Sequence, residues 1–135
     1  MRIHHIGYFV ENIENAVKGF QRLGFSRIGE ITEDSYRGVY ILFLDNSGLL
    51  VEIIQPISEE SPIYRLSRKY KNSPYHICYQ TSDISTEIEK LVNDEVERFI
   101  LTQPPQPAPA IPSSPNVAFL VSGSVGMIEL VEIKE

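Results

Sequence analysis

Side chains that could ligate a metal ion recur at matching places in the two halves of this sequence. In each half a histidine stands on an early strand-like run and a glutamate on a late one, namely His5 with Glu52 and His76 with Glu129. Imidazole nitrogens and carboxylate oxygens together suit Ni²⁺, Zn²⁺, Co²⁺, Fe²⁺ or Mn²⁺. The recurrence therefore predicts a divalent metal site built from all four side chains.

The neighbours of these residues favour the metal site over ordinary packing. Strand alternation places Gly7 on the face of His5 and Cys78 on the face of His76, where a packing face would carry Val or Leu. Both glutamates share their faces with apolar residues, and a buried carboxylate needs a partner. A structural histidine or an edge-strand charge could explain any one position. Neither explains the same pattern in both halves.

The elements that must position these residues follow one order in both halves, strand-helix-strand-strand-strand. The first half predicts a strand over 2–10, a helix capped by Asn12 and stopped at Gly24, and strands over 25–33, 36–45 and 49–56. The second half predicts a strand over 74–81, a helix capped by Asp83, and strands near 96–103, 116–122 and 126–134. A short helix near 62–70 is expected between the halves.

This order predicts a single α+β domain over residues 1–135. Module one covers 1–56, a linker with the short helix covers 57–73, and module two covers 74–135. Neither half alone, at under about 70 residues, has the core to stand by itself. The modules must therefore pack together or exchange with a second chain, and a homodimer is expected.

The two glutamates are further apart in sequence than the two histidines, which fits a longer loop in the second half. Six prolines lie within 104–115, and this run is expected to be neither strand nor helix, because proline lacks the donor and fixes φ. It could be a simple surface loop. It could also be a stiff lid that excludes water from a cavity.

Composition excludes several classes of protein. A net charge of -6 and a pI near 5.1 argue against a nucleic-acid binder, although a basic cluster over 65–71 could meet an anion or form a solvated helix face. No apolar stretch approaches the roughly 18 residues that span a bilayer, so no membrane partner is expected. Cys78 is the single cysteine, which predicts a reducing, cytoplasmic setting.

The motifs around the metal-ligating residues resemble those of the vicinal oxygen chelate superfamily, which includes glyoxalases, bleomycin resistance proteins and dioxygenases. The likeness covers nearly the whole chain and rests on His5 in HHIGYFV, Glu52 in VEIIQP, His76 in YHICYQT and Glu129 in IELVE. It implies two tandem βαβββ modules that form a curved mixed β-sheet half-barrel around a metal cavity. Within the superfamily the chain looks most like glyoxalase I and methylmalonyl-CoA epimerase.

The resemblance implies a metal-dependent enzyme of the glyoxalase I type. Such an enzyme converts the hemithioacetal of methylglyoxal and a thiol, such as glutathione, into a hydroxyacyl thioester by proton transfer. The implied catalytic residues are Glu129, which shuttles the proton, and Glu52. The alternative is epimerisation of an acyl-CoA at its α-carbon. Some epimerases carry a second catalytic carboxylate in a Gly-Val-Val-Glu-type run, whereas the matching run here ends in the apolar Ile41.

Two further functions of this superfamily remain as alternatives. A ring-cleaving dioxygenase would need two histidines and one glutamate with open positions for oxygen, and Glu52 as a fourth ligand argues against it. A non-catalytic small-molecule binding protein of the same fold would commonly lack the four ligands. The presence of all four therefore counts against that function.

Overall fold

The computed structural model describes residues 1–134 and divides them into two compact units. The amino-terminal unit is His5–Tyr75. The carboxy-terminal unit joins Met1–His4 to the residues from His76 onward. The short helix of the expected linker thus belongs to the amino-terminal unit. The single domain over 1–135 stays a prediction.

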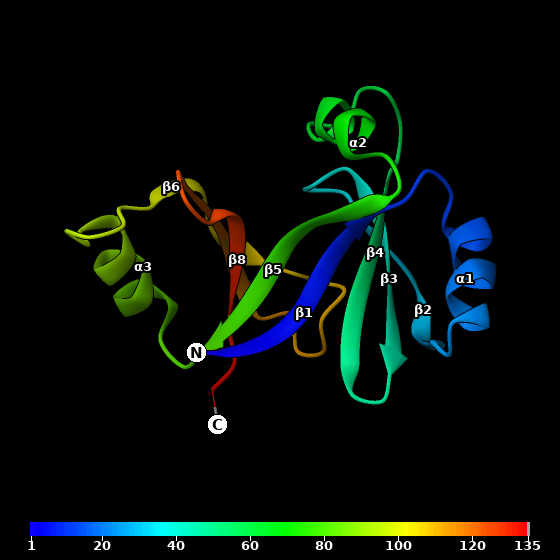
Figure 1. Cartoon of the computed structure of the whole chain (residues 1–135), viewed down its shortest axis with the longest axis horizontal. Helices are drawn as coiled ribbons and strands as arrows, with labels where there is room; N and C mark the ends of the chain where they lie inside the picture. The colour runs from blue at the N-terminus through cyan, green and yellow to red at the C-terminus, as the bar shows by residue number, and fades with distance from the viewer. Residues whose placement is uncertain (135) are drawn as a thin grey trace. The chain divides into compact units, whose positions relative to one another are not determined.

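The amino-terminal unit contains a mixed four-stranded sheet with the order β2-β3-β4-β1. Its elements are β1 (Arg2–Phe9), α1 (Ile13–Arg22), β2 (Ser26–Asp34), β3 (Val39–Asn46), β4 (Leu49–Pro56) and α2 (Tyr64–Tyr70), and α1 lies beside this sheet (Figure 1). Only the β1–β4 pair is parallel among these neighbours, because α1 and two strands separate them in the chain.

The carboxy-terminal unit repeats this topology with the order β5-β8-β7-β6. Its elements are β5 (Ser73–Thr81), α3 (Ile84–Val92), β6 (Ile100–Pro107), β7 (Asn116–Ser122) and β8 (Gly126–Glu132). The β5–β8 pair is parallel, and the other two pairs are antiparallel. The predicted α+β class with two βαβββ modules is therefore confirmed.

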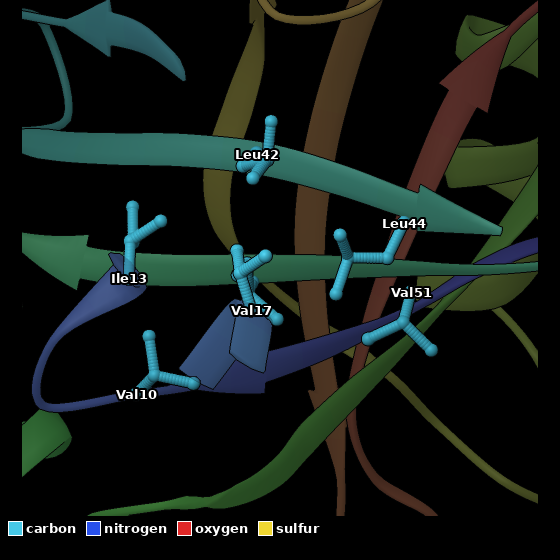
Figure 2. Close-up of a cluster of buried hydrophobic side chains, with 7 residues drawn as sticks. Val10, Ile13, Val17, Leu42, Leu44 and Val51 are labelled. Carbon is cyan, nitrogen blue, oxygen red and sulfur yellow. The ribbon is translucent and has the colours of Figure 1, made fainter. Parts of the chain in front are cut away.

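Each unit has a core between its helix and one face of its sheet. In the amino-terminal unit, Ile13 and Val17 of α1 pack with Leu42 and Leu44 of β3, as Figure 2 shows. In the carboxy-terminal unit, Ile84 of α3 packs with residues of β7 and β8, namely Ala118, Leu120, Ile128 and Leu130. The opposite face of each sheet carries the predicted metal-ligating residues.

The helix ends follow the sequence closely. Asn12 accepts a hydrogen bond from the backbone N–H of Asn15, and Asp83 accepts one from that of Thr86, so both N-caps are confirmed. Gly24, with φ of 99°, follows the end of α1 as a left-handed residue. Within residues 1–134 each helix is too short or too polar to cross a bilayer.

The expectation that the proline run contains no strand is wrong for its first part. β6 extends through Pro104, Pro105 and Pro107. It is the end strand of the carboxy-terminal unit's order, and its register with β7 shifts twice, between Leu101 and Gln103 and between Gln103 and Gln106. Bulges and a free edge tolerate residues that cannot donate to a ladder.

Candidate functional site

The amino-terminal unit brings His5 and Glu52 together. His5 lies on β1 and Glu52 on the parallel strand β4, where Glu52 is in register with Gly7, two residues beyond the histidine on the same face. The His5 Nε2 and Glu52 Oε1 atoms are 3.5 Å apart, and the two side chains are 0% and 7% exposed. Local strand register therefore creates a buried imidazole–carboxylate pair.

The carboxy-terminal unit builds the same pair from His76 and Glu129. Here Glu129 of β8 is in register with Cys78 of β5, again two residues beyond the histidine. The His76 Nε2 and Glu129 Oε1 atoms are 3.1 Å apart, and the side chains are 0% and 6% exposed. The two units thus hold equivalent pairs at equivalent positions.

An aromatic ring flanks each pair, and the sequence reasoning missed both rings. Phe43 of β3 is in register with Glu52, and its ring lies edge-on to that of His5, with centroids 5.3 Å apart and an interplanar angle of 86°. Phe119 of β7 is in register with Glu129 and meets His76 in the same way, at 5.2 Å and 86°. A recurring Phe-Leu on the strand before each glutamate strand was the available signal.

A second pair of equivalent contacts joins each glutamate strand to its helix. Gln55 Oε1 accepts a hydrogen bond from the backbone N–H of Ile13, at 2.9 Å. Glu132 Oε2 accepts one from that of Ile84, at 3.0 Å. Each acceptor stands three residues after a metal-site glutamate and so points to the opposite sheet face. The outer side of each glutamate strand is thereby tied to the first residue of its helix.

The basic residues differ in how available they are to bind an anion. The guanidinium of Arg37 donates from Nη1 to the buried carboxylate of Asp34, at 2.8 Å, and its side chain is 12% exposed. That engagement makes Arg37 a poor anion anchor. The cluster on and after α2 is exposed, and its member Arg68 lies 3.8 Å from a carboxylate oxygen of Glu11. Its members are Arg65, Arg68, Lys69 and Lys71.

The donor separations within each unit fit ligation of one ion by both members of a pair. Two donors that each lie about 2.1 Å from an ion at tetrahedral or octahedral angles are roughly 3.0–3.4 Å apart. The observed separation is 3.1 Å for His76–Glu129, within this range, and 3.5 Å for His5–Glu52, just above it. The carboxylate of each pair is also buried beside apolar side chains, and a buried carboxylate needs a charged partner. The residues present therefore fit a divalent metal.

Comparison with known proteins places the chain in a family. Residues 4–112 match the profile of the glyoxalase/bleomycin resistance protein/dioxygenase superfamily. An ethylmalonyl-CoA/methylmalonyl-CoA epimerase of Cereibacter sphaeroides is 25% identical over 67% of this chain and 68% of its own. The chain spans only about half the length of mammalian relatives such as the mitochondrial methylmalonyl-CoA epimerase of Mus musculus, matched over 54% of its length.

Solved structures resemble the chain over nearly its whole length. A hypothetical protein of Bacillus halodurans shares 28% identity, covering 99% of this chain and 95% of that one, with a TM-score of 0.83. The methylmalonyl-CoA epimerase of Streptomyces coelicolor, in complex with 2-nitronate-propionyl-CoA, shares 20% identity, covering 98% and 96%, with a TM-score of 0.78. At 20% identity, the likeness to the Streptomyces coelicolor enzyme shows a similar fold.

Proposed function

We propose that this chain, which belongs to the glyoxalase/bleomycin resistance protein/dioxygenase superfamily, is a metal-dependent epimerase. It would act at the α-carbon of an acyl-CoA thioester. The names of its relatives support the acyl-CoA alternative better than the glyoxalase I reaction expected from the motifs. The single observation that carries the proposal is the equivalence of the two imidazole–carboxylate pairs.

The metal site of this enzyme would consist of both pairs together. His5 and Glu52 would supply two ligands from the amino-terminal unit, and His76 and Glu129 two from the other. The chemistry supplied by a bound divalent ion is stabilisation of the negative charge that develops on the thioester oxygen as the α-proton leaves.

Two carboxylates in equivalent positions suit epimerisation, since inversion requires a proton to leave one face of the α-carbon and another to arrive at the opposite face. Glu129, starting as a carboxylate, takes the α-proton. Glu52 would donate a proton to the other face and would serve as a ligand once it is a carboxylate, and the roles reverse for the other epimer. The apolar Ile41 stands where some epimerases carry a catalytic carboxylate, so Glu52 is the second base here.

Exchange of the α-proton with solvent deuterium tests this assignment. Wild-type enzyme loaded with Co²⁺ should place deuterium at the α-carbon of both epimers of methylmalonyl-CoA. Glu52→Gln and Glu129→Gln should each abolish inversion and keep exchange in opposite single epimers, because each retains one base. Turnover of methylglyoxal with glutathione, without acyl-CoA exchange, would instead establish the glyoxalase I reaction. Absence of both reactions would favour a binding protein.

A further inference from the structure

We propose that Phe43 and Phe119 are positioning residues that hold the imidazoles of His5 and His76 in the orientation that ligates a metal ion. The role in ligation rests on the proposed function. The contacts between each phenylalanine ring and its imidazole do not depend on an ion. Each phenylalanine lies opposite the glutamate of its pair on the neighbouring antiparallel strand, and its ring meets the imidazole of the same pair.

The ring geometry restricts how each imidazole turns. A histidine side chain that pairs through Nε2 must keep its ring plane fixed about the Cβ–Cγ bond, and the strand backbone alone leaves that torsion broad. Edge-to-face contact is the preferred arrangement of neighbouring rings, and both contacts here have an angle of 86°. A rotated imidazole would lose this contact and direct Nε2 away from the carboxylate.

The repetition argues for a role beyond filling space. Many apolar side chains could occupy the sheet face beside a glutamate. Both units nevertheless place phenylalanine at the cross-strand position and set it at the same distance and angle to the histidine. The Phe20–Phe25 pair of the amino-terminal unit also meets edge-on, at 5.1 Å and 79°. Those rings contact each other and pack against the core that contains α1, not against a histidine.

Replacement of each ring by an aliphatic side chain tests the proposal. Phe43→Leu and Phe119→Leu should each weaken Co²⁺ binding about tenfold or more, the usual effect of removing a partner that orients a ligand. Phe43→Tyr and Phe119→Tyr keep the ring and should restore affinity. Phe25→Leu is the matched control, which should lower the melting temperature and leave Co²⁺ affinity unchanged. Phe43→Met and Phe119→Met serve where a leucine variant does not fold.

A second readout needs no metal. In the metal-free protein, nitrogen-detected NMR reports the tautomer of each imidazole. Phe43→Leu should change the tautomer populations of His5 alone. Phe119→Leu should change the tautomer populations of His76 alone. Unchanged tautomers together with wild-type Co²⁺ affinity in folded leucine variants would overturn the proposal. If wild-type protein bound no Co²⁺, the proposed function would fail, and the tautomer measurement would still decide whether the rings position the imidazoles.

Discussion

In each unit the glutamate pairs with the residue two positions after the histidine, and this register decides where the candidate ligands lie. Parallel pairing sets Glu52 beside Gly7 and Glu129 beside Cys78, and each histidine stands two positions earlier on the same face. The alternation of side chains along a strand made the faces predictable from the sequence. The recurring Phe-Leu marks Phe43 and Phe119 in the sequence, but their edge-on contact with histidine was not predictable, because it spans the intervening strand and depends on the folded register.

Loss of one imidazole should nearly abolish metal binding. His76→Ala removes a ligand itself, so its Co²⁺ affinity should fall by more than the roughly 10–100-fold that loss of a supporting partner costs. Isothermal titration calorimetry measures the effect. Gln21→Ala is the control, since Gln21 lies at an exposed position of α1. Equal losses in the two variants would contradict the assignment of ligands.

At the scale of elements, the same hydrogen bond recurs between a glutamate strand and its helix. Removing either acceptor leaves the first helical N–H without that partner. Gln55→Ala and Glu132→Ala should therefore each lower the free energy of unfolding by about 1 kcal/mol, as loss of an N-terminal helix cap does. Urea denaturation measures the change. Gln21→Ala, at an exposed position of α1, should stay within about 0.5 kcal/mol of wild type.

The cap of α3 also predicts a dependence of stability on pH. Hydrogen bonds from the Thr86 hydroxyl and from its backbone N–H lower the pKa of Asp83 below its ordinary value of 3.8. A depressed carboxyl pKa contributes stability above the ordinary pKa, and the contribution is lost as the pH falls through the folded-state pKa. Asp83→Asn should therefore melt below wild type at neutral pH, and the gap should narrow as the pH falls below the ordinary pKa of 3.8. A constant gap would contradict this prediction.

Most elements could be predicted from the sequence because their signals are local. Asn12, Asp83 and Gly24 mark helix ends, and the apolar stripe of α1 marks its buried face. The extension of β6 over residues 104–107 could not, because proline excludes a strand only where its missing donor would be needed. An edge strand with two register shifts removes that need, and both conditions are properties of the assembled sheet.

At the scale of the whole molecule, the proposed site requires both units to act on one ion. Co²⁺ at about 100 times its dissociation constant should stabilise wild type by about 2.7 kcal/mol, visible as a higher melting temperature. Glu52→Ala and Glu129→Ala, one in each unit, should each remove nearly all of this increase. Retention of about half the increase in both variants would show that each unit binds its own ion.

The expected homodimer remains a prediction at the same scale. Light scattering on purified protein should give twice the 15.3 kDa mass of the chain. The measurement should not change on addition of Co²⁺ if the metal site and the association of chains are separate. A monomeric mass would remove exchange of modules between chains from consideration.

The first strand has a consequence for attempts to separate the repeated halves. Residues 6–9 of β1 pair with β4, whereas Met1–His4 group with the residues that follow Tyr75. A fragment starting at His76 would thus lack four residues that its own unit uses. Expressed alone it should remain unfolded, and a peptide carrying the opening residues would be required for complementation. The boundary between the two compact units therefore does not coincide with the boundary between the two repeats.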